Sequence, residues 1–341
     1  MKKLILSLVA AIVGTTASFA QSSLLATLSH EGNITTYYGA SALREAHAAA
    51  VDGDIITLSS GSFTSVKIEK GITIRGAGMA MDAATQSEPT IIVGDFEIAV
   101  PAESATPLTI EGIYNDYFIK QTTDLKNATF LKCRFSDLFT TQNSTKIENL
   151  TMIHCKVAKE IVCPSNSTIS CLNCALWNVR TKDGSSSVFE MTNCVIQKGN
   201  VGSELYSSTF KNCIFIGNNG GDNFFNYTSG PNAIYNCLWL EDNSTHTPFR
   251  KIQNTTNKVL DYAAVFKTCK NGTYSDSETF ELTADCIVDY KGNDGTQVGI
   301  YGGSMPFSIT PSNPQITKCN VAAKSTADGK LSVDITVQGA E

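Results

Sequence analysis

The sequence lacks the features that mark several large classes of protein. Charged residues make up only 17% of the chain, and 26 basic residues stand against 32 acidic ones. This balance gives no sign of a nucleic-acid partner. Beyond the N-terminus, no apolar run approaches the roughly 20 residues of a membrane-spanning helix. The four histidines form no constellation with a nucleophile or a metal-ligand spacing, so no metal site is predicted.

The N-terminus predicts export. Two lysines precede an apolar run over residues 4–13, and small residues follow at Ala17 and Ala20. This arrangement is typical of a secretory signal peptide, which we assign to residues 1–20 with cleavage before Gln21. The apolar run is too short to span a bilayer, and no cysteine follows it that would carry a lipid anchor. The style of the signal is bacterial, and the periplasm, the outer surface and the medium remain open as destinations.

Six cysteines define an internal repeat. They recur at separations of 19 to 24 residues, each within a similar short apolar phrase. These cysteines are Cys133, Cys155, Cys174, Cys194, Cys213 and Cys237. Apolar residues recur five and three positions before each cysteine and two positions after it, so the alternation of a β-strand slips once in every unit. Each unit therefore predicts two strands that meet at a bend, with both apolar sets facing one interior.

The position before the cysteine predicts the bend itself. It is occupied by Asn173, Asn193, Asn212 and Asn236 in the last four units. Asparagine tolerates unusual backbone angles and can bond to neighbouring main chain. Stacked on one another, these amides would form a ladder. A unit of about 20 residues cannot bury its own apolar face, so the units must stack as a solenoid.

At this point the chain resembles the right-handed parallel β-helix proteins of the pectin-lyase-like superfamily. Residues 42–63 resemble the capping helix and first coil of that family, and residues 70–78 the coil that follows. Residues 280–289 and 294–303 resemble its closing coils. The resemblance implies an all-β, right-handed parallel β-helix over residues 21–303, followed by a separate tail over residues 304–341.

The eleven cysteines are an odd number for a disulfide framework. Neighbouring coils stand about 4.8 Å apart, whereas the Cβ atoms of a relaxed disulfide are near 3.8 Å. We therefore expect the six repeat cysteines to form a reduced, buried ladder. Cys171 and Cys174 have the spacing of a redox or zinc pair, but the repeat explains both as interior positions. Cys163, Cys269, Cys286 and Cys319 fall outside the repeat.

An enzyme of the resembled superfamily would carry carboxylates about one coil apart on its outer face. Asp116 and Asp137 meet that spacing and are the candidate catalytic residues. Calcium would be a cofactor only in the lyase alternative, and no other cofactor is predicted. The catalytic motifs of pectate lyases, polygalacturonases and pectinesterases are absent from the sequence, which weighs against an enzyme.

Exposed aromatic residues would favour carbohydrate binding, because sugar rings stack on apolar faces. Trp177 follows its cysteine at an outward position, with Arg180 and Asp183 close behind, and these are the candidate binding residues. The alternative is that Trp177 packs beneath the loop that it begins. Tyr114, and the pair at residues 117–118, are assigned to interior and loop packing.

One outward position loses its polarity along the chain. The residue after each repeat cysteine is basic in the first two units, Arg134 and Lys156, and apolar in the last four. These four are Ala175, Val195, Ile214 and Leu238. An exposed apolar stripe usually lies beneath a cover or a partner, and the tail is the predicted cover. Residues 304–318 contain three prolines and predict a linker, and residues 331–337 alternate as one β-strand. That strand must add to an edge of its own chain or of a protein partner.

Together these observations predict an exported β-helix scaffold that binds polysaccharide at the cell surface or outside the cell. A polysaccharide lyase or glycoside hydrolase acting on an acidic polysaccharide is the first alternative. A structural envelope component whose tail strand joins a neighbour is the second.

Overall fold

The computed structural model describes residues 24–81, 88–139, 145–181, 187–198, 208–216, 232–240, 262–268, 275–312, 315–322, 324–326 and 328–338. The predicted signal peptide, Asp183 and Cys269 lie outside these residues. In the described part of the chain, no helix is long and apolar enough to cross a membrane.

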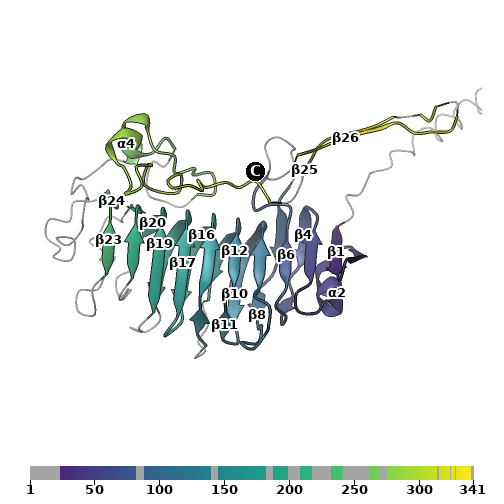
Figure 1. Cartoon of the computed structure of the whole chain (residues 1–341), viewed down its shortest axis with the longest axis horizontal. Coiled ribbons are helices and arrows are strands. Elements are labelled where there is room, and N and C mark those ends of the chain that lie inside the picture. Colours follow the sequence, from purple (N-terminus) through teal and green to yellow (C-terminus); the bar gives the residue numbers. More distant parts are fainter. Residues whose placement is uncertain are drawn as a thin grey trace, which may run out of the picture.

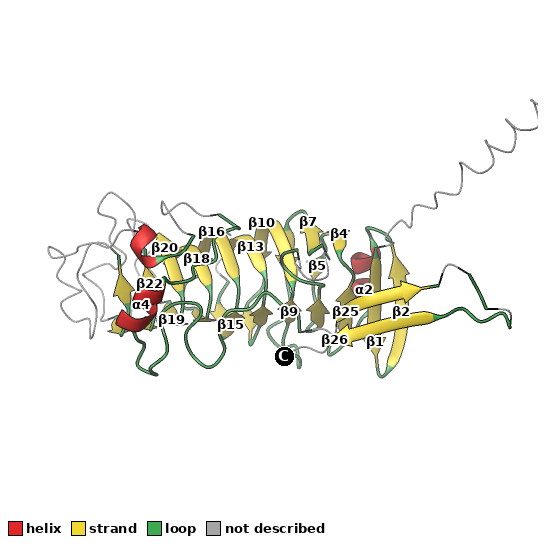
Figure 2. Ribbon diagram, turned by 90° about the horizontal axis from the view of Figure 1, so that it is seen from above, coloured by secondary structure: helices red, strands yellow, loops and turns green. Residues whose placement is uncertain are grey.

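Two long sheets of mostly parallel strands run side by side along the molecule and form the solenoid (Figures 1 and 2). Sheet A contains, in order, β2 (Asn33–Tyr38), β1 (Leu25–His30), β3 (Ile55–Leu58), β6 (Thr73–Arg75), β9 (Thr109–Glu111), β12 (Thr129–Leu131), β15 (Leu150–Ile153), β17 (Thr168–Leu172), β19 (Val188–Thr192), β21 (Thr209–Lys211) and β23 (Ala233–Tyr235). Sheet B contains β24 (Leu238–Trp239), β22 (Ile214–Phe215), β20 (Val195–Lys198), β18 (Ala175–Thr181), β16 (Lys156–Cys163), β13 (Arg134–Leu138), β10 (Ile113–Gln121), β7 (Thr90–Val93) and β4 (Gly61–Thr64), with β5 (Lys67–Ile68) and β8 (Phe96–Ile98) beside them. A small third sheet pairs β11 (Leu125–Lys126) with β14 (Ile147–Glu148). The all-β parallel solenoid predicted from the repeat is confirmed.

Every repeat cysteine follows a bend between a strand of sheet A and a strand of sheet B. The residue before it has a left-handed backbone, with φ of 50° at Asn173, 52° at Asn193 and 53° at Asn212. Asparagine adopts this conformation more readily than most residues. In sheet A, Phe130 pairs in register with Met152 one coil on, and both are buried. The predicted bend and the predicted interior positions are therefore confirmed.

The cysteine ladder is reduced. The described cysteine side chains, including all six of the repeat, are buried free thiols. Cys155 shows the pattern: its Sγ donates to the carbonyl oxygens of Ile153 at 3.4 Å and of Phe130 at 3.3 Å. Burial raises the pKa of Cys155, and it raises the pKa of Cys163 to about 12. These thiols therefore act as small apolar groups, as predicted.

The N-terminal end is closed by helix α2 (Ala42–Ala49), which buries Leu43 and Ala46 against the first coils, as predicted. His47 is also buried and accepts a hydrogen bond from the amide of Glu69 at 3.3 Å, which is a packing role. Strands β1 and β2 form an antiparallel hairpin that extends sheet A beyond β3. This hairpin holds the cap on the stack.

The predicted stripe of apolar residues is covered, but the covering segment differs from the prediction. Val195, Ile214 and Leu238 are buried in a second core that lies outside the solenoid. It is completed by α3 (Tyr262–Val265), α4 (Ala284–Asp289) and apolar residues of the following segment. We call residues 275–312 the strap. Its first residues contact the middle of the stack, where Asp276 binds Arg134. After α4 the chain runs back along the outside of the stack (Figure 1).

The strap corrects one prediction. Residues 280–303 contribute no strand to either long sheet, so they are not closing coils. Two of the bend asparagines bond to the strap. Asn173 Nδ2 donates to the carbonyl oxygens of Ile300 at 2.7 Å and Gly302 at 2.8 Å, and Asn212 exchanges two hydrogen bonds with Asn293.

The tail beyond the strap forms an antiparallel hairpin. The predicted strand exists as β26 (Val333–Gln338), and it pairs with β25 (Gln315–Val321). Part of the predicted linker is therefore a strand, because β26 takes its partner from the segment that precedes it. The hairpin projects away from the solenoid (Figures 1 and 2), and Val333 and Ile335 on β26 are exposed. Of the predicted tail, Phe307 in the strap joins the second core, whereas the hairpin does not cover the apolar stripe.

Candidate functional site

The two candidate carboxylates lie on neighbouring strands but do not form a pair. Asp137 on β13 stands in register with Phe118 on β10, because the register shifts between Asn115 and Phe118. Asp116 falls within that irregularity and forms an ion pair with Arg134. Each acid is thus held by its own cation rather than facing the other.

Asp137 is buried, and its carboxylate contacts two neighbouring side chains. Its Oδ2 accepts a hydrogen bond from Ser136 Oγ at 2.8 Å and lies 3.3 Å from Lys159 Nζ. Calcium needs six to eight oxygen ligands, several of them free carboxylates. Asp116 and Asp137 do not fit such a site, and the described residues contain no cluster of three metal-ligating side chains.

Aromatic side chains gather on the outer face of sheet B. Tyr117 and Phe118 are 45% and 42% exposed, which corrects their assignment to interior packing. Lys159 Nζ lies 5.8 Å from the centre of the Phe118 ring. One strand further, Trp177 on β18 is half-buried. We call Tyr117, Phe118, Lys159 and Trp177 the aromatic shelf.

Charged pairs continue this face across β16 and β18. Arg180 Nε donates to Glu160 Oε2 at 2.7 Å, and a second bond joins Nη2 to Oε1 at 3.4 Å. Glu160 is in register with Asp137 on one side and Asn178 on the other. Of the predicted binding residues, Arg180 is bonded to Glu160 on this face, and Trp177 on the same strand is half-buried.

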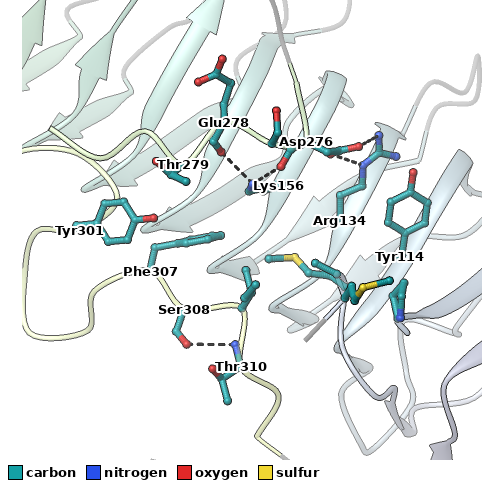
Figure 3. Close-up of a pocket in the computed structure, with 16 residues that line it drawn as sticks. Tyr114, Arg134, Lys156, Asp276, Glu278, Thr279, Tyr301, Phe307, Ser308 and Thr310 are labelled. Atoms are coloured by element: carbon teal, nitrogen blue, oxygen red, sulfur yellow. Dashed lines mark hydrogen bonds and ion pairs between the residues drawn. The ribbon is translucent and has the colours of Figure 1, made fainter. Parts of the chain in front are cut away.

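A pocket of about 640 Å³ opens between sheet B and the strap. Its floor is the outward position that follows the bend, occupied by Tyr114, Arg134 and Lys156 on three successive strands. The strap supplies one wall, and the loop around residues 79–81 and 89 supplies the other (Figure 3). We call this the strap pocket.

Arg134 joins the strap to the solenoid. Its Nε and Nη2 atoms each donate to a carboxylate oxygen of Asp276 at 3.0 Å, and Nη1 pairs with Asp116. The guanidinium carbon lies 4.5 Å from the centre of the Tyr114 ring, a cation–π distance. Burial raises the pKa of Tyr114, so its hydroxyl stays protonated. The forked bond to Asp276 fixes the wall of the pocket.

Lys156 lies at the centre of the pocket (Figure 3). Its ammonium donates to the carbonyl oxygens of Asp276 and Glu278, both at 3.1 Å, and lies 5.9 Å from the Phe307 ring centre. Burial lowers the pKa of Lys156. Sequence analysis found Arg134 and Lys156 as an outward basic pair but missed the pocket, because Asp276 is 142 residues away from Arg134 and no repeat relates them.

No family model matches this chain. No curated protein and no solved structure matches it significantly.

Proposed function

We propose that this protein is an exported scaffold of the pectin-lyase-like type that binds polysaccharide through the aromatic shelf. The observation that carries the proposal is the exposure of Tyr117 and Phe118 on the outer face of a parallel stack. Aromatic rings stack on the apolar faces of sugars, while charged neighbours bond to hydroxyl groups. Lys159 and Arg180 supply such neighbours on the following strands.

The repeat geometry supports an extended ligand over a compact one. Phe118, Asp137, Glu160 and Asn178 follow one another in register across four strands. Neighbouring strands lie about 4.8 Å apart, so the row spans about 14 Å along the stack. Asp137 and Asn178 are buried, so a linear chain of sugars running along the solenoid axis would contact Phe118 and Glu160 of this row.

The test is binding of purified residues 21–341 to a panel of neutral and acidic polysaccharides by affinity electrophoresis. The variant Tyr117→Ala/Phe118→Ala should lose at least about tenfold in affinity, because stacking of aromatic rings is removed. Tyr235→Ala removes an exposed tyrosine from sheet A and serves as the control. Equal binding by both variants, or no binding by the wild-type chain, would reject the proposal. Release of new reducing ends from the panel would favour the lyase or hydrolase alternative.

One further observation favours assembly as a second role. The exposed apolar residues of β26 form a row on an antiparallel hairpin of only two strands, which is marginal by itself in water. A neighbouring protein could receive this hairpin. The variant Val333→Asp/Ile335→Asp should abolish assembly and leave the melting temperature unchanged, as judged by light scattering and calorimetry. Assembly that persists in the variant would count against this role.

A further inference from the structure

The strap pocket differs in character from the aromatic shelf. Its volume of about 640 Å³ lies in the range of about 300–1,000 Å³ that is typical of small-molecule sites. Apolar side chains form much of its lining, among them Met79, Met81, Phe307 and Ile309. Methionine adapts its shape to irregular apolar ligands. Such walls suit hydrocarbon better than the hydroxyl-rich surface of a sugar, since hydroxyl groups without hydrogen-bond partners are costly to bury.

The two cationic side chains on the floor of the pocket differ in the groups that bind them. Arg134 is paired with the carboxylates of Asp116 and Asp276. Lys156 binds only main-chain carbonyl oxygens, and within the described part of the chain it forms no ion pair with a carboxylate. A lysine ammonium has three donors, and two of them are used here. One donor is therefore left for a ligand, and the carboxylates of Asp276 and Glu278 act on the charge of Lys156 only through space.

The residues around Lys156 determine the side from which a ligand can reach its ammonium group. Phe307 lies on the pocket side of the ammonium, whereas the carboxylate of Glu278 points away from it (Figure 3). The pocket thus places an ammonium with one unused donor next to apolar walls. We propose that the strap pocket binds an amphipathic carboxylate, whose carboxylate group pairs with Lys156 and whose hydrocarbon part lies against Met79, Phe307 and Ile309.

Charge complementarity supports an anion as the occupant. Burial lowers the pKa of Lys156 by more than the nearby carboxylates of Asp276 and Glu278 raise it, which means that its charge is poorly solvated. A carboxylate within hydrogen-bond distance would favour the charged form and gain a charge-assisted hydrogen bond. Each methylene group that leaves water for the apolar walls would add to the affinity.

The experiment is isothermal titration of the full mature chain with decanoate, decanol and decyltrimethylammonium. We expect saturable binding of decanoate at one site, at least tenfold weaker binding of decanol, and no binding of the cation. Equal affinity for decanoate and decanol would overturn the proposal, and so would the absence of saturable decanoate binding.

Two variants test whether decanoate binds in this pocket. Lys156→Met should weaken decanoate binding at least tenfold and leave decanol binding unchanged. Lys126→Met removes an exposed lysine from β11, far from the pocket lining, and should bind decanoate as the wild-type chain does. Unchanged decanoate affinity in Lys156→Met, or an equal loss in Lys126→Met, would overturn the proposal.

A third variant, Ile309→Glu, tests whether Lys156→Met weakens decanoate binding only because it displaces the strap. Lys156 also holds two strap carbonyl oxygens, whereas Ile309 is 40% exposed and belongs to neither apolar core. A carboxylate at position 309 should repel decanoate and block the apolar wall, so binding should be lost while the melting temperature stays the same. Retained binding in this variant would overturn the proposal. Because the aromatic shelf is a separate surface, the variant Tyr117→Ala/Phe118→Ala should still bind decanoate.

Discussion

One outward position of the repeat has opposite surroundings in two parts of the molecule. In the middle of the stack it is occupied by Tyr114, Arg134 and Lys156, which form the open floor of a pocket. Toward the C-terminal end the same register continues into buried apolar residues, of which Val195 and Ile214 are fully covered. The strands and the register do not change between the two parts. What changes is the contact with α3, α4 and apolar strap residues such as Leu282, Val298 and Ile300.

The comparison shows that burial on the outside of a solenoid is set by segments distant in sequence. Interior positions are apolar in every coil, since each coil must stack on the next. The outward positions Val195 and Ile214 are apolar and fully buried, because a second layer covers them. Gly299 illustrates how close this layer comes. It has a φ of 81°, and a Cβ at this position would lie 2.6 Å from Ile214 Cδ1. Glycine is required there for both reasons.

The strongest test of this comparison is a charge placed in the covered part. Ile214→Asp should reduce the free energy of unfolding by about 3–5 kcal/mol, because an unpaired carboxylate would be buried between the solenoid and its cover. Ile91→Asp is the control, since Ile91 occupies the same outward column on β7 and is only half-buried. We expect a loss of no more than about 1 kcal/mol there. Denaturant unfolding measures both, and similar losses would show that the cover does not distinguish the two parts.

The bend position provides a second, smaller test. Asn173→Ala should cost about 2–3 kcal/mol, because the variant loses the two hydrogen bonds to the strap and places alanine in a left-handed conformation. Asn173→Gly should recover the backbone part of this loss but not the hydrogen bonds. In the open part, Lys132 occupies the equivalent bend with a φ of 51°.

Lys132→Gly is therefore the matched variant for the open part. Glycine removes the backbone strain at this position, and Lys132 makes only a long contact of 3.5 Å with the strap residue Ser312. We expect the stability to change by less than about 1 kcal/mol. Hydrogen exchange of the strap amides should rise in Asn173→Gly and not in Lys132→Gly. A rise in both variants would contradict the assignment of strap anchoring to the asparagines.

The contrast between repeated contacts within the stack and contacts with the strap also explains which features could be predicted from the sequence. The bend asparagines, the cysteine ladder and the interior apolar residues were predicted correctly, because each is repeated about every 20 residues and reflects contacts between adjacent coils. The burial of Val195 and Ile214 was also predicted, since apolar outward residues require a cover. The identity of the cover was wrong, because the strap has no periodicity that relates it to the strands beneath it.

The candidate site was predicted less well, and the cause is local. Between Asn115 and Phe118 strand β10 advances three residues while β13 advances two. Continued without a break, the register of Asn115 with Phe135 would place Tyr117 opposite Asp137, whereas the structure places Phe118 there. Asp116, which was chosen for a spacing of about one coil, is opposite Asp137 in neither register. The same irregularity turns Tyr117 and Phe118 outward. A β-bulge of this kind leaves no clear signal in a single sequence, so the aromatic shelf could be recognised only in the structure.

The smallest effect concerns two histidines, one in the N-terminal hairpin and one beneath the strap. His30, in the N-terminal hairpin, bonds to Asp54 Oδ1 at 2.8 Å, and this bond and the charge of Asp54 raise its pKa above the ordinary value of 6.5. His154 lies beneath the strap with Nε2 3.0 Å from the carbonyl oxygen of Met305, and burial lowers its pKa below 6.5. Proton binding therefore favours the folded chain at His30 and the unfolded chain at His154.

The two histidines should consequently give opposite pH dependence. The stabilisation from His30 is complete below about pH 6.5 and is lost as the pH rises through the raised pKa of the folded state. The stabilisation from His154 is present above about pH 6.5 and is lost as the pH falls through the lowered pKa. Melting temperatures between about pH 5 and pH 8, compared for the wild-type chain, His30→Gln and His154→Asn, separate the two contributions. The wild-type advantage over His30→Gln should shrink toward alkaline pH, and its advantage over His154→Asn should shrink toward acidic pH. A parallel change in both variants would mean that His154 is solvated like a surface residue, and that the strap does not cover the bend at this coil.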